Sequence, residues 1–229
     1  RRKLETLFIE RGDANSQAAA YQFLQDVREH AALLLERGPG EYGFIHLTFE
    51  EYLAAVAIVL QAQGNSKLIA QFLASHIGDT AWHEVSLLTI AFIGIRQQLP
   101  KIAGEVIESL LQESPGTPGQ AAVLTGEAVL DTWPSGTSPH SKELVTKALI
   151  PAMQGSNVRP ELRRRAGLLL GRLGWRPQDL GRFVEIAAGK FLFGPKKEER
   201  GIPQPYWTAK YPVTNIQYAR FVLMGGYQQ

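Results

Sequence analysis

One histidine in this chain of 229 residues stands where an imidazole could contact an anion, at the junction of an expected strand and an expected helix. Tyr42, Phe44 and His46 alternate, so their side chains share one side of an extended segment. Thr48 and Glu51 then form a Thr-x-x-Glu pattern, which predicts a capping box at a helix start. Backbone N–H groups and the helix dipole favour an anion there. His46 is therefore a candidate phosphate ligand, and a histidine bonded to a backbone carbonyl is the structural alternative.

The residues around this junction also predict which face of the helix is buried. Leu47 and Tyr52 stand at the two positions of a hydrophobic staple. Four apolar residues then recur at helical spacing: Phe49, Leu53, Val56 and Leu60. We therefore expect this stripe to face a core.

Residues 44–55 resemble the Phe-x-His-x-x-Phe-x-Glu-Tyr-x-Ala-Ala signature that ends the winged-helix module of NACHT-type NTPases, which are signal-transducing ATPases of the STAND class. In that family the motif histidine touches the β-phosphate of bound ADP and helps to hold the resting state. The resemblance implies that His46 would be this ligand in a longer parent protein. It also implies ATP or ADP with magnesium as the cofactors of that parent, and none in this chain.

The composition is that of a folded protein, with 45% apolar and 20% charged residues. The net charge of +2 favours no class of partner. The absence of cysteine excludes disulfides, thiolate metal sites and thiol nucleophiles, and it fits a reducing cytoplasm. No apolar run reaches the length of a membrane span. Because the chain starts at Arg1 without a methionine, we expect a piece of a longer cytoplasmic protein.

The fold expected for residues 1–176 is mainly α. Residues 1–62 predict the end of a winged helix, with a helix over 16–30 and a β-hairpin over 33–46. Residues 63–176 predict helices joined by Pro/Gly-rich loops, in HEAT-like pairs or in a compact bundle. Winged helices often bind DNA, but the 16–30 helix offers Arg28 alone against Asp26 and Glu29. Nucleic acid is therefore a disfavoured partner.

Three consecutive arginines, Arg163 to Arg165, lie on the helix expected after Pro160. The core-facing positions of this helix are predicted to be Leu162, Ala166, Leu169 and Leu173. Arg163 and Arg165 then flank the apolar stripe and are expected in solvent, as part of a charged face. A patch for phosphate or for an acidic partner is the alternative.

Residues 177–229 resemble the opening of the formylglycine-generating enzyme family, also called sulfatase-modifying factors, which has an α+β C-type-lectin-like fold. The resemblance rests on Val184-Glu185-Ile186, on Gly189, Phe191 and Gly194, and on Tyr211-Pro212-Val213-Thr214-Asn215. Ala187 and Phe193 depart from the family pattern. The chain also lacks the family's catalytic cysteines, so formylglycine synthesis is excluded for this piece. The charged residues 196–200 are expected to form a solvated loop.

No other pattern of catalysis is present. The chain has no Gly-x-x-x-x-Gly-Lys-Ser/Thr loop and no Gly-x-Ser-x-Gly elbow. The other histidines lack metal-ligand spacing and are expected in solvated or capping roles: His30, His76, His83 and His140. We therefore predict neither a catalytic residue nor a metal ligand, and no enzyme within this chain.

These features favour a fragment of a STAND/NACHT-type signalling or defence protein, with a helical sensor region leading into a lectin-like recognition domain. The expected partners are proteins, or further copies, at the helical region, and an unknown ligand at the lectin-like domain. Two alternatives are a targeting arm on a formylglycine-generating-type oxidase and a scaffold that displays a ligand-binding surface.

Overall fold

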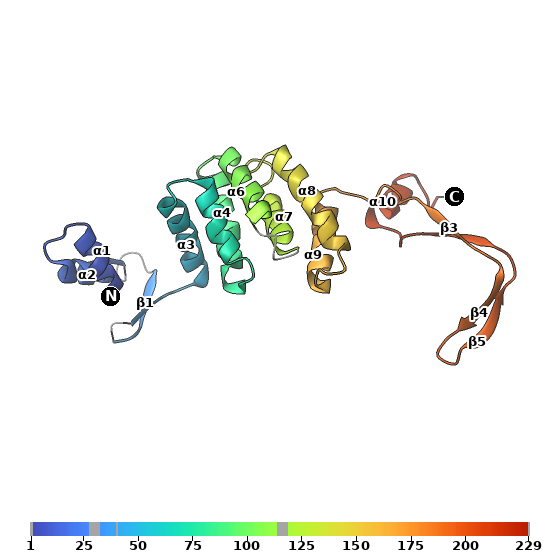
Figure 1. Ribbon diagram of the computed structural model, residues 1–229, viewed down its shortest axis with the longest axis horizontal. Coiled ribbons are helices and arrows are strands. Elements are labelled where there is room, and N and C mark those ends of the chain that lie inside the picture. Colours follow the sequence, from blue (N-terminus) through green and yellow to red (C-terminus); the bar gives the residue numbers. More distant parts are fainter. Residues whose placement is uncertain (1, 28–32, 40, 114–118, 229) are drawn as a thin grey trace. The chain divides into compact units, whose positions relative to one another are not determined.

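The computed structural model describes residues 2–27, 33–39, 41–113 and 119–228. The chain forms two compact units, Arg1–Gly174 and Trp175–Gln229. Mostly helices make up the first unit, and short antiparallel strand pairs with one helix make up the second (Figure 1).

The first unit opens with two helices and a hairpin. Helix α1 spans Arg2–Glu10 and α2 spans Ser16–Asp26, and Phe8 meets Phe23 edge to face between them. Strands β1 (Leu34–Gly38) and β2 (Glu41–Phe44) pair antiparallel, with a bulge near Glu36. The hairpin was predicted from the sequence, and the expected end of the 16–30 helix lies outside the described residues.

The helices of the remaining part of this unit start where side chains or prolines predict a start. Asn65 and Ser138 accept hydrogen bonds from amides of the first turns of α4 and α8, and Asp79 caps the short η2. Pro100 and Pro160 open α6 and α9. The elements are α3 (Leu47–Gln61), α4 (Ser66–Ser75), η2 (Thr80–Trp82), α5 (His83–Ala91), η3 (Phe92–Arg96, a π-helical turn), α6 (Pro100–Glu113), α7 (Gln120–Thr132), α8 (Pro139–Gln154) and α9 (Pro160–Arg172).

These helices stack in two layers. Helices α3, α5, α7 and α9 follow one another in one layer, and α4, α6 and α8 follow one another in the second. Each helix packs on the next member of its own layer, and α5 to α9 also contact across the layers. Contacts that run mainly between neighbours are typical of helical solenoids.

The core between the layers is aliphatic. Leu162, Ala166 and Leu169 of α9, and Leu173 directly after it, are all buried, as the sequence predicted. Gly174 ends this helix at φ +91°, a left-handed conformation that glycine adopts without a steric penalty. The largest fully buried side chains elsewhere in this core are Ile69, Leu73, Ile90, Ile93, Ile107, Leu110, Leu149 and Leu170.

Two predictions for α3 are wrong. The helix begins at Leu47, so its N-cap is His46 and not Thr48. The buried face is also rotated from the expected stripe, because the helix packs on α5 through a different side. Its buried residues are Ala55, Ile58 and Val59, while Phe49, Leu53 and Leu60 are exposed.

In the second unit, β3 (Phe183–Ile186) pairs with β6 (Tyr206–Ala209), and β4 (Gly189–Phe193) pairs with β5 (Glu198–Ile202). The loop predicted over 196–200 is therefore wrong at its end, because cross-strand pairing with β4 draws Glu198 to Arg200 into a strand. Thr214 caps α10 (Asn215–Leu223) with a complete capping box to Gln217. No described residue of this unit is fully buried, so the apolar side of α10 faces no core here.

Candidate functional site

His46 caps α3 with its own imidazole. Its backbone is extended at φ −140° and ψ 137°, and its Nδ1 accepts a hydrogen bond from the Thr48 amide at 3.2 Å. An accepting Nδ1 carries no proton, so the proton of the neutral ring is on Nε2. Among the described residues no partner meets Nε2, and the side chain is exposed. The cap thus holds one N–H donor in solvent beside the positive end of a helix.

Two carboxylates follow His46 in the sequence, and their negative charges would repel an anion bound there. Glu50 and Glu51 follow in the first turns of α3 and have no described salt-bridge partner. Both line a cavity of about 240 Å³ between α3 and the start of α5, which His46 does not line. The negative charges of Glu50 and Glu51 therefore disfavour an anion at the start of α3.

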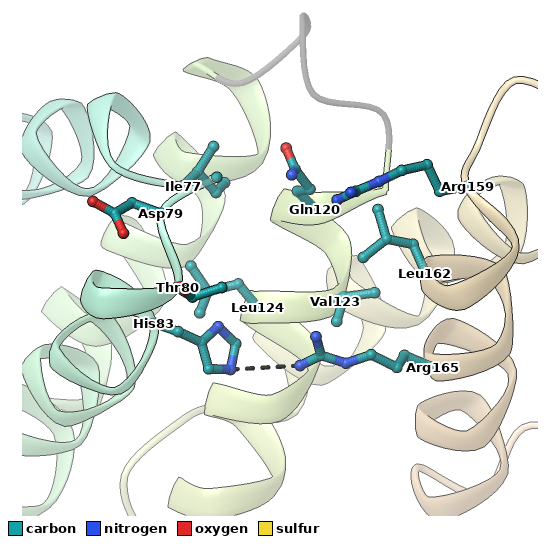
Figure 2. Close-up of a pocket in the computed structure, with 11 residues that line it drawn as sticks. Ile77, Asp79, Thr80, His83, Gln120, Val123, Leu124, Arg159, Leu162 and Arg165 are labelled. Atoms are coloured by element: carbon teal, nitrogen blue, oxygen red, sulfur yellow. Dashed lines mark hydrogen bonds between the residues drawn. The ribbon is translucent and has the colours of Figure 1, made fainter.

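A second cavity, of about 260 Å³, lies where α5, α7 and α9 begin. Figure 2 shows Arg159 reaching toward Gln120 at one end and Arg165 reaching toward His83 at the other. Apolar side chains of Val123, Leu124 and Leu162 separate the two ends. No local sequence pattern predicts this cavity, because its lining residues come from α5, α7, α9 and the segment before α5.

A charged network ties these three helices together at the floor of the cavity. The Arg165 guanidinium lies 2.5 Å from Oε1 of Glu127, and His83 Nε2 lies 3.0 Å from Oε2 of the same carboxylate. The second contact is a hydrogen bond when Nε2 carries the proton. Arg165 also approaches His83 Nε2 at 3.5 Å.

Burial opposes the charge of Glu127 and would raise its pKa. Hydrogen bonds from His83 and Arg165 outweigh this effect, so the pKa of Glu127 is lowered. Asp131 lies one turn further along α7, and burial raises its pKa while Arg172 partly offsets the rise. The carboxylate of Glu127 is therefore held in its charged form between α5 and α9.

Each of the three consecutive arginines, Arg163 to Arg165, has a hydrogen-bond partner. Arg164 is exposed and bonds Glu161, and the Arg163 Nε donates to the Met153 carbonyl. The expectation of a solvated side chain is correct for Arg163 and wrong for Arg165, which is half-buried against Glu127. The expectation is wrong for Arg165 because its partner, Glu127, is a side chain of α7 that lies 38 residues earlier in the sequence.

His76 has a capping role, as expected, because it is the C-cap of α4 and its Nδ1 contacts the Phe72 carbonyl at 2.9 Å. The ring of His76 also packs against Phe72 and Trp82, with centroid distances of 4.6 and 4.3 Å. His83 differs from its expected solvated or capping role, because it joins the network with Glu127. Within the described part of the chain, no group of three or more His, Asp or Glu side chains could hold a metal ion. The same residues include no helix long and apolar enough to cross a membrane.

Residues 1–58 match the family model described as a winged helix-turn-helix domain C-terminal to NACHT. The chain therefore carries a winged-helix domain of the kind associated with NACHT proteins, and His46 lies inside the matched segment. No curated protein and no solved structure matches the chain.

Proposed function

We propose that this chain is part of an ATP-dependent signalling protein of the NACHT type, in which His46 contacts a phosphate of bound ADP. The observation that carries this proposal is the exposed Nε2–H of a histidine fixed at the start of α3, within the segment that matches the NACHT-associated domain. The phosphate-binding loop and magnesium would come from the parent protein, so this chain would contribute a contact and no catalytic residue.

The helices after α3 suit the role of a relay. Each helix of the α3–α5–α7–α9 layer packs on the next, so a displacement at one end is passed on by direct contact. In this proposal the helical region senses or assembles with protein partners, in the cytoplasm, and the winged helix holds the nucleotide-bound resting state. Neither nucleic acid nor a membrane is a proposed partner.

The second unit is proposed to be the opening of a lectin-like recognition domain. The Pro212-Val213-Thr214-Asn215 run and the complete capping box at Thr214 support this reading. An oxidase of the formylglycine-generating type and a ligand-display scaffold are the alternatives for the parent. Sequence beyond residue 229 distinguishes them, because only the oxidase needs a pair of cysteines.

The nucleotide role is tested with His46→Asn in the complete protein. Asparagine is among the best N-cap residues, so the variant keeps the start of α3 while it removes the Nε2 donor. ADP affinity, measured by calorimetry, should fall roughly tenfold, which corresponds to one charge-assisted hydrogen bond, and basal signalling should rise. His140→Asn, at an exposed histidine of α8, is the control and should bind ADP as the wild type does. Unchanged ADP affinity in His46→Asn would refute the proposal.

A further inference from the structure

The cavity at the start of α5, α7 and α9 is small. Its volume of about 260 Å³ lies below the range of roughly 300–1,000 Å³ that holds drug-sized ligands. It has room for a small molecule or for one side chain of a partner, and not for a nucleotide.

The middle of the cavity is apolar. Val123, Leu124 and Leu162 line it and are 2%, 4% and 8% exposed, so their positions are fixed by the surrounding core. Figure 2 places these three side chains between the two polar ends. A bare inorganic anion would leave this wall without a partner, whereas an aliphatic group would cover it.

At the end of the cavity where Arg165 lies, the positive charge of Arg165 is balanced by the negative charge of Glu127. Arg165 is bonded to Glu127, which also contacts His83. This network holds its own counter-charge and forms a floor. A further full charge is therefore not needed there.

The opposite end carries a cation without a counter-charge. Arg159 is exposed, and the side chains of Arg159 and Gln120 have no hydrogen-bond partner among the described residues. Figure 2 shows both side chains directed toward each other over the cavity. The lining carboxylate of Asp79 points away and accepts from the Ala81 amide at 2.9 Å. A planar guanidinium with a neighbouring amide donor matches a carboxylate.

We propose that this cavity binds a carboxylate on a short aliphatic stem. Arg159 and Gln120 hold the carboxylate, and the stem lies against Val123, Leu124 and Leu162. The starts of α7 and α9 add a weaker favourable field for the negative charge. Either a free short-chain organic acid or a glutamate side chain of a partner protein has this chemistry.

Calorimetry of the 229-residue chain tests the site, with butyrate as the probe. We expect saturable binding that Arg159→Gln weakens roughly tenfold, because one charged hydrogen-bonding partner is lost. The matched control is Arg164→Gln on the same helix, since Arg164 is exposed, bonds Glu161 and does not line the cavity. This control should bind butyrate as the wild type does. Absence of saturable binding to every probe, or wild-type affinity in Arg159→Gln, overturns the proposal.

A series of acids tests the apolar wall, and a peptide identifies the source of the carboxylate. From acetate through propionate to butyrate, affinity should rise roughly fourfold per methylene as each is buried. Equal affinity along the series contradicts a stem-binding wall. A blocked Ala-Glu-Ala peptide that binds more tightly than butyrate indicates a protein side chain, and butyrate binding without peptide binding indicates a free acid.

Discussion

Glu127 and Arg165 join the seventh and ninth helices through a contact of 2.5 Å between Oε1 and the guanidinium. Their side chains are 20% and 35% exposed, so the pair is partly shielded from solvent. His83 of α5 contacts the second oxygen of the same carboxylate. One acidic side chain thus connects three helices of one layer, at the floor of the cavity.

We predict that Glu127→Gln destabilises the first unit in a pH-dependent way. At about pH 7 the free energy of unfolding should fall by about 1–2 kcal/mol. This loss lies between the values typical of exposed and of buried ion pairs. The pKa of Glu127 is lowered in the folded state, so its contribution is present above the unfolded pKa and disappears as the pH falls through the folded pKa. Thermal unfolding should therefore separate wild type and variant at about pH 7, and the separation should shrink as the pH falls through the folded-state pKa of Glu127.

The control for this pH dependence is Glu161→Gln. The pKa of Glu161 is also lowered, by the hydrogen bond from Arg164, but both groups are fully exposed. Solvent screening leaves little stability in such a pair. A difference in thermal stability between wild type and Glu127→Gln that stays the same at low pH would contradict the assigned ion pair.

Several helix starts of this fold coincide with local sequence signals. Pro100, Pro160 and Thr214 mark starts because their effect on the backbone depends on neighbours within one turn. The cavity and its network did not follow from such signals. Glu127 meets His83 and Arg165 only after three helices have stacked, and no pattern within one helix encodes that contact.

Local sequence patterns also failed to predict the buried face of α3 and one strand of the second unit. The apolar residues of α3 surround much of the helix, so spacing alone did not decide which side would pack on α5. Residues Glu198 to Arg200 carry three charges, which favours a loop, yet pairing with β4 forms a strand. Tertiary contacts override local preference in both cases.

Gly94 should tolerate no side chain. A Cβ placed on it would lie 2.1 Å from the Gly136 carbonyl oxygen, so the backbone of η3 and the connection before α8 would have to separate. Gly94→Ala is expected to lower stability by about 1–3 kcal/mol or more, measured by urea unfolding. An unfolding midpoint equal to that of the wild type would show that the two backbones do not approach so closely.

Gly171→Ala is the matched substitution without a clash. No heavy atom lies within 4 Å of a Cβ at this position of α9, and alanine favours the helix. We expect this variant to be more stable by about 0.5–1 kcal/mol in the same urea experiment. If Gly94→Ala lowers the free energy of unfolding and Gly171→Ala raises it, the effect of local packing is distinguished from that of helix propensity.

His46 should contribute to the start of α3 independently of any nucleotide. His46→Ala removes the acceptor for the Thr48 amide and is expected to destabilise the helix by about 0.5–1 kcal/mol. His46→Asn should restore this loss. Amide hydrogen exchange at Thr48 reports the cap directly, and equal protection in both variants would contradict the capping role.

The start of α10 offers a separate test in the second unit. Thr214 accepts from the Gln217 amide, and the Gln217 side chain accepts from the Thr214 backbone, so the two residues satisfy each other. Thr214→Ala should cost about 0.5–2 kcal/mol of local stability and speed amide exchange in the first turn of the helix, while Thr214→Ser should change little. Wild-type exchange rates in the first turn of α10 in Thr214→Ala would contradict the capping box.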